Sequence, residues 1–147
     1  MTHEYSGRYA SKHPPGIRPN EAIAKAIRKM SPEGELTCGV AERIAKELNV
    51  SMSEVGTTAD LMEAKIGKCQ LGLFGWGNKP NHGKDVSRAD SVSQDVEIAL
   101  GEVVKKGKVT CSAIWAIADR LGRERKEIST ACETLGLKIC ACQLGAF

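Results

Sequence analysis

The chain has 147 residues, 41% of them hydrophobic and 27% charged, and a formal net charge of +3, which permits contact with a polyanion without requiring it. No stretch approaches the roughly 18 apolar residues of a membrane span, and the first nineteen residues lack the apolar core of a secretory signal. We therefore expect a cytoplasmic protein with no membrane contact, whose six cysteines stay reduced.

Residues 1–19 are polar and rich in turn formers, including His-Pro-Pro-Gly at positions 13–16. No periodic apolar face can form in such a stretch. We therefore expect a flexible arm, made basic by Arg8, Lys12 and Arg18. An arm of this kind can lie along a DNA groove, and a plain unstructured tail is the alternative.

A helical apolar period begins after Asn20, which is a favoured capping residue. Ile23, Ile27 and Met30 then share one helix face. Because proline disfavours helical geometry in the residue before it, Pro32 is expected to end this first helix.

Two more helices and a strand are predicted after it. Thr37 follows a short extended segment and can cap the second helix, while Ser51 and Glu54 have the spacing of a capping box at the start of the third. The strand is predicted over residues 65–71 with a bulge or a mid-strand twist, because the apolar parity changes within it. The apolar positions expected inside the second and third helices are Val40, Ala41, Ile44, Ala45, Leu48, Val55, Ala59 and Met62.

An internal repeat then becomes visible. Residues 36–74 recur as residues 109–147 at a constant offset of 73, without insertion or deletion, and 14 of the 39 positions are identical. The block Cys-Gln-Leu-Gly ends both copies, at 69–72 and at 142–145. Several other positions, such as Val55 with Ile128 and Met62 with Leu135, exchange one aliphatic residue for another, which an unchanged packing environment permits.

The repeat sets the expected domain organisation. We predict two copies of one small unit, at residues 20–74 and 92–147, joined by a linker at 75–91. The second copy begins with a helix from about Ser93 and ends with a strand over 138–144. The fold class is therefore mainly α with short β strands (α+β), each copy holding three helices. The apolar face of that first helix consists of Val96, Leu100 and Val103.

A short turn between the second and third helices carries the motif with functional content. In the second copy Ala118 permits close approach of the helices, Gly122 permits a left-handed turn, and Ile128 fills the angle between them. This frame resembles the helix-turn-helix motif of DNA-binding proteins. The whole unit resembles the winged helix-turn-helix superfamily, present as two tandem copies. The first copy has Ala45, Asn49 and Val55 in the same frame.

The resemblance implies that the third helix enters the major groove of double-stranded DNA. Its solvent side, which we call the reading face, should then contact bases and phosphates. Arg123 departs from the pattern, since the first copy has the apolar Val50 at this position. After Gly145 too few residues remain for a full wing, so the last strand either forms a truncated hairpin or pairs with residues 109–111. The implied DNA-binding residues are Arg123, Arg125, Lys126, Ser129 and Thr130 in copy two, with Ser53 and Thr57 in copy one.

Three functions follow as hypotheses. The first is a DNA-binding transcriptional regulator that uses both units. The second is a protein-interaction or assembly module, in which repeat 1 binds a protein partner or a second copy, because its third helix has no cation on the reading face. The third is a thiol- or metal-dependent sensor, since Cys38 and Cys69 are 31 residues apart, as are Cys111 and Cys142.

We favour structural cysteines over a metal site, because a zinc site normally needs four ligands in closely spaced pairs. We expect no cofactor and no catalytic activity, since His3, His13 and His82 all lie in segments without predicted regular structure. Trp115 replaces Glu42 of the first copy at a position expected to face outward, where it marks a contact surface or an ordinary boundary residue.

Overall fold

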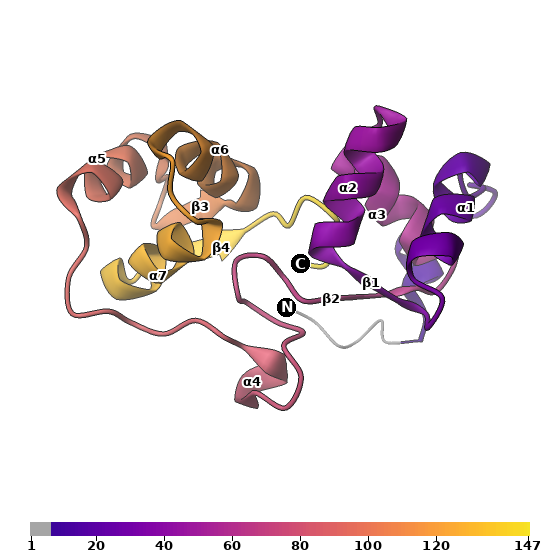
Figure 1. Ribbon diagram of the computed structural model, residues 1–147, viewed down its shortest axis with the longest axis horizontal. Helices are drawn as coiled ribbons and strands as arrows, with labels where there is room; N and C mark the ends of the chain where they lie inside the picture. The colour runs from indigo at the N-terminus through magenta and orange to yellow at the C-terminus, as the bar shows by residue number, and fades with distance from the viewer. Residues whose placement is uncertain (1–6) are drawn as a thin grey trace. The chain divides into compact units, whose positions relative to one another are not determined.

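The computed structural model describes residues 7–147 (Figure 1). The protein is mainly helical with strands of three residues each, so the predicted mainly α class with short β strands is confirmed. The first six positions of the predicted arm, His3 among them, lie outside the described residues. The chain forms two compact units: unit 1 contains Met1–Cys69 and Gln143–Phe147, and unit 2 contains Gln70–Cys142.

Unit 1 has the predicted succession of helices and strands. Its caps form as expected: Asn20 accepts a hydrogen bond from the amide of Ile23, Thr37 accepts one from that of Val40, and Ser51 forms a capping box. These caps satisfy amides at the first turn of each helix, which otherwise have no intrahelical partner. The elements are η1 (Tyr9–Lys12), α1 (Glu21–Met30), β1 (Glu35–Thr37), α2 (Cys38–Leu48), α3 (Met52–Leu61) and β2 (Lys65–Gly67).

Unit 2 repeats this order after α4, a single turn with left-handed residues inside it. From its second element onward, each element lies 73 positions after its counterpart in unit 1, and only α7 differs, being one residue longer than α3. The repeat therefore includes the first helix, beyond the 39 matched positions. The elements are α4 (Pro80–Gly83), α5 (Gln94–Val103), β3 (Lys108–Thr110), α6 (Cys111–Leu121), α7 (Arg125–Leu135) and β4 (Lys138–Cys140).

The strands pair in parallel, with Thr37 opposite Gly67 and Thr110 opposite Cys140. Of the two arrangements expected for the last strand, pairing with residues 109–111 is the one observed. The predicted longer strand with a bulge is wrong. β2 and β4 end after three residues because the next residues, Lys68 and Ala141, have left-handed φ values of 46° and 53° that turn the chain out of the sheet.

The turn between the second and third helices has the predicted geometry in both units. Asn49 and Gly122 are left-handed, with φ values of 54° and 64°. The carbonyl of Ala45 accepts the amide of Val50 at 3.0 Å, and Ala118 accepts the equivalent bond at 2.9 Å. Such bonds satisfy carbonyls that a helix end leaves open. The residues that fill the angle between the helices, Val55 and Ile128, are completely buried.

The final segment of each repeat packs in the unit built mainly by the other repeat. Residues 143–147 belong to unit 1, and residues 70–74 belong to unit 2. In Figure 1 the last residues, drawn in yellow, lie with the helices of unit 1. The unit boundaries thus differ from the predicted 20–74 and 92–147.

The predicted linker is folded as part of unit 2. The amide of Gly75 donates to the carbonyl of His82 at 3.0 Å, and that of Trp76 donates to Gly83 at 3.1 Å. Gly83 has a φ of +83° and no room for a Cβ, which would lie 2.5 Å from the Trp76 nitrogen. A compact loop therefore stands where composition indicated a linker.

The arm also differs from the expectation of a flexible segment. The backbone amides of Tyr9 and Ala10 donate to the Glu63 carboxylate at 2.7 and 2.8 Å. Asp60, which is 3% exposed, receives the ammonium of Lys12 at 3.0 Å and the ring of His13 at 2.8 Å. Residues 9–13 are held against unit 1 because these two carboxylates supply the acceptors.

Candidate nucleic-acid interface

Arg123, the first cation of the predicted reading face, is engaged with acidic side chains of unit 2. Its guanidinium donates to both Asp95 carboxylate oxygens, at 3.0 and 2.8 Å, and pairs with Glu127. The Glu127 hydrogen bond, followed by Asp95, raises the pKa of Arg123. The pKa of Asp95 is lowered, mainly by the Ser93 hydroxyl, with help from the Val96 amide and Arg123. This charge is therefore already neutralised inside the unit.

Arg125 is also tied to its own unit. Its guanidinium stacks on the Trp115 ring at 3.6 Å from the ring centre, donates to Gln70 Oε1 at 2.8 Å, and lies 3.9 Å from the Asp119 carboxylate. Trp115 is 8% exposed, so the expectation that it faces outward is wrong. The stacked guanidinium covers the indole, which explains how a large aromatic ring is buried on the side of α6 where repeat 1 has Glu42.

Lys126 donates to the Asp85 carboxylate at 2.6 Å, and Lys79 lies 3.3 Å from the same group. Lys126 first, then Lys79, lowers the pKa of Asp85. The hydroxyl residues differ from the expected open face: Ser129 is 1% exposed and Thr130 is half-buried. Each of the three predicted cations therefore has a partner supplied by unit 2.

The reading face of α3 carries Ser53, which is exposed, and Thr57, which is half-buried. Between and beyond them, Gly56 and Asp60 are buried. Residues 143–147 approach at Gly56, and residues 9–13 bind at Asp60. The structure thus does not bring the two predicted hydroxyl residues together with any cation on an open helix face.

Both third helices are covered in a similar way. In unit 1 the covering segment is η1 with His13; in unit 2 it includes residues 84–89. Lys84 pairs with Glu133 at 2.9 Å, and the amide of Ala89 donates to the Thr134 hydroxyl at 2.9 Å. These contacts reach Asp60 on α3 and Glu133 and Thr134 on α7, whereas Ser53 and Lys126 near the start of the same helices stay exposed.

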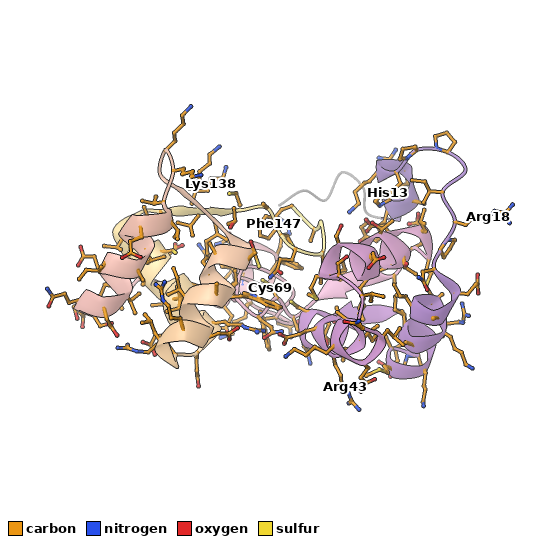
Figure 2. The ribbon with its side chains drawn as sticks, turned by 90° about the horizontal axis from the view of Figure 1, so that it is seen from above. His13, Arg18, Arg43, Cys69, Lys138 and Phe147 are labelled. Atoms are coloured by element: carbon orange, nitrogen blue, oxygen red, sulfur yellow. The ribbon has the colours of Figure 1, made fainter. Side chains whose placement is uncertain are left out.

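A different basic surface appears at the start of the β3–β4 pair, and we call it the lysine cluster: Lys105, Lys106, Lys108 and Lys138. Lys105 and Lys108 exchange backbone hydrogen bonds of 3.0 Å across a tight turn. Lys108 is the register partner of Lys138 on the neighbouring strand. All four residues are exposed. In Figure 2 the label Lys138 stands beside long, nitrogen-tipped side chains that extend away from the ribbon.

The backbone of this turn suits the sequence. Lys106 and Gly107 have φ values of 51° and 75°, the pair of left-handed conformations that a two-residue hairpin turn requires. The amide of Lys138 then donates to the Gly107 carbonyl at 2.9 Å, which fixes β4 beside the turn. The lysine side chains are therefore held near one another by backbone geometry.

No ion pair involves the lysine cluster within residues 7–147. Like charges directly opposite in a sheet destabilise it, so this arrangement has a cost that the described part of the chain does not offset with a carboxylate. Sequence reasoning missed the cluster. The run Lys-Lys-Gly-Lys was visible, but Lys138 joins it only through the parallel pairing of strands.

The equivalent surface of unit 1 has the opposite character. At the positions of the four lysines the first repeat has Pro32, Glu33, Glu35 and Lys65. The glycine keeps its left-handed conformation, with Gly34 at a φ of 85° in place of Gly107, but Glu33 is not left-handed as Lys106 is. Two charges are therefore reversed on either side of a shared left-handed glycine.

Within residues 7–147 none of the six cysteines is in a disulfide, and Cys38, Cys69, Cys111 and Cys132 are buried. Burial raises the pKa of the Cys132 thiol from its ordinary 9.0 to about 11. Among residues 7–147 no three His, Cys, Asp or Glu side chains are grouped as metal ligands would be. In the same part of the chain, every helix is too short or too polar to cross a membrane.

Comparisons of this chain with protein-family models, with curated proteins and with solved structures found no match.

Proposed function

We propose that this protein binds double-stranded DNA through its phosphate backbone, and that the lysine cluster of unit 2 is the principal contact. The supporting observation is that four exposed lysines are held together on a tight turn and a strand edge with no ion-pair partner within residues 7–147. Lysine ammonium groups are common phosphate ligands. A polyanion would also relieve the repulsion among them.

The same reasoning disfavours the third helix of unit 2 as the contact surface. To bind a phosphate, Arg123 and Lys126 must first break ion pairs with carboxylates at 2.8 and 2.6 Å. The lysine cluster has no such ion pairs to break within residues 7–147. The partner is still the double-stranded DNA that the helix-turn-helix resemblance implies. It binds, however, at a surface that recognises the charge of the phosphates more than the base sequence.

The experiment measures affinity for a random-sequence DNA duplex by fluorescence anisotropy over a range of salt concentrations. Each neutralised phosphate contributes about −0.9 to the slope of log affinity against log salt, so four lysines predict a slope of up to about −3.6. The variant Lys106→Glu/Lys108→Glu installs the residues that repeat 1 has on the same turn. It should reduce the slope to about −1.8 or less and lower the affinity at least tenfold at low salt, by about 1.4 kcal/mol or more.

The matched control is Lys25→Glu/Lys29→Glu, two exposed lysines of α1 in unit 1, which changes the net charge of the chain by the same amount. It should leave the slope close to that of the unmodified protein. Equal losses in the two variants would show that net charge, and not the lysine cluster, governs binding. Absence of binding by the unmodified protein at low salt would also overturn the proposal.

A further inference from the structure

We infer that residues 143–147 exchange between molecules, so that two copies of the chain form a dimer in which this segment of each copy completes unit 1 of the other. The segment is called the exchange segment below. The inference is independent of the DNA proposal and concerns the receptor that unit 1 offers on α3.

Unit 1 contains a shaped receptor for the exchange segment. Leu144 is 2% exposed, and a Cβ added at Gly56 would lie 2.2 Å from the Leu144 carbonyl oxygen. A glycine inside a helix weakens it, so Gly56 has a structural reason to be there, which is the close approach of this backbone. At the next residue, Lys12 donates to the carbonyl of Gly145 at 3.0 Å.

Residues 70–74, the counterpart of the exchange segment in the first repeat, lie in unit 2 and again share the sequence Gln-Leu-Gly. Leu71 is 1% exposed, Gln70 accepts a hydrogen bond from Arg125 at 2.8 Å, and the carbonyl of Gly72 accepts one from Asp85 at 2.7 Å. In both units, then, a segment that begins Gln-Leu-Gly completes the core of the unit built mainly by the other repeat. The receptor in unit 1 binds a segment of the other repeat. The same segment of a second copy is chemically identical and can bind there in its place.

The hinge before the exchange segment is strained. Ala141 has a φ of 53°, and non-glycine residues adopt this left-handed conformation at a cost. An extended conformation at Ala141 would remove that cost and carry the segment away from its present course. Exchange between copies keeps every contact of the segment and relaxes the hinge, which is the usual energetic basis of domain swapping. A second copy of the chain can therefore fill the receptor on α3 without any new complementary surface.

The first test uses two variants that complement each other, one of full length and one shortened by the exchange segment. Gly56→Leu blocks the receptor but keeps the exchange segment, and a chain ending at Cys142 lacks the segment but keeps the receptor. Each variant alone should have the mass of a monomer by light scattering at high protein concentration. Their mixture should form a complex of one copy of each. A mixture that stays monomeric, or a variant that dimerises by itself, contradicts the inference.

The second test leaves receptor and segment intact and changes only the hinge. Ala141→Gly removes the left-handed strain and should weaken dimerisation of the otherwise unmodified chain about fivefold or more. Ala141→Val increases the strain and should strengthen dimerisation by a similar factor. Dimer dissociation constants from light scattering over a concentration series give the result, with circular dichroism as the control for helix content. Equal constants for the three proteins overturn the inference.

Discussion

The turn that precedes β1 in unit 1 and the turn that precedes β3 in unit 2 share a left-handed glycine and carry opposite charges. Gly34 and Gly107 occupy the same left-handed position, with φ values of 85° and 75°. Around them repeat 1 places Glu33 and Glu35, whereas repeat 2 places Lys106 and Lys108. Because all four side chains are exposed, none of them is needed for the core. The comparison teaches that two copies of one fold can carry opposite surface charges, and so suit different partners, without any change in the core.

The third helices give a second comparison between the units. Asp60 on α3 is buried and binds two side chains of the preceding segment, the ammonium of Lys12 and the ring of His13. Glu133, at the equivalent position on α7, is a third exposed and receives a single cation, Lys84, at 2.9 Å. In both units, then, a preceding segment binds an acidic residue of the third helix, and the two acidic residues differ in how deeply they are buried.

The largest expected effect tests this difference in depth. Asp60→Ala removes a buried acceptor and leaves the Lys12 ammonium and the His13 ring beside α3 without it, so it should lower the free energy of unfolding by about 3 kcal/mol. Glu133→Ala breaks a partly exposed pair and should cost about 1 kcal/mol or less. Urea unfolding of both variants, followed by circular dichroism, measures the two values. Equal losses would mean that the two contacts do not differ as their burial indicates.

A somewhat smaller effect on stability is expected at the position of α3 that the exchange segment approaches, and at its counterpart on α7. Gly56→Ala should lower the free energy of unfolding by about 1–3 kcal/mol, because the added methyl overlaps the Leu144 backbone. Ser129 has the equivalent position in unit 2 and its buried hydroxyl has no hydrogen-bond partner within the described residues. Ser129→Ala should therefore be neutral or stabilise by up to about 1 kcal/mol. A stabilising Gly56→Ala, measured by the same unfolding experiment, would show that helix propensity outweighs the close approach.

The next prediction transfers the charge pattern from unit 2 to unit 1. Glu33→Lys/Glu35→Lys gives the first turn the lysines of the second, around a glycine with the same left-handed conformation. Affinity for random duplex DNA at low salt should rise about tenfold, because new phosphate contacts become available. Fluorescence anisotropy measures the gain. The control is Lys25→Glu in the same background, which lowers the net charge away from the turn and should leave most of the gain in place.

The features that sequence predicted correctly depend on residues a few positions apart. The caps at Asn20, Thr37 and Ser51 and the left-handed residues Asn49 and Gly122 are examples. In each case one side chain, or the absence of one, satisfies a backbone group in the adjacent turn. Such local interactions can be predicted from the sequence without knowledge of the tertiary fold.

The features that sequence missed depend on distant partners. The identical Cys-Gln-Leu-Gly blocks indicate that Leu71 and Leu144 are buried, but not in which unit, because the two receptors are built from the same repeat. Likewise, the cations of α7 looked free because their partners lie outside the third helix: Asp85 for Lys126, and Gln70 for Arg125. Apolar period and charge count carry no information about such long-range pairing.

The smallest expected effect contrasts the core of the two units at one position, where α3 has Ala59 and α7 has Cys132, both completely buried. The Cys132 thiol has a pKa of about 11 in the folded protein against an ordinary 9.0. The folded state therefore holds this proton more tightly than the unfolded state, so its contribution to stability is complete below pH 9 and is lost as the pH rises toward 11. Stability should fall more steeply over that interval in the unmodified protein than in Cys132→Ala, which carries the residue of repeat 1. Comparing the two proteins removes the titration of lysines common to both, and identical pH profiles would show that the thiol is not held protonated by burial.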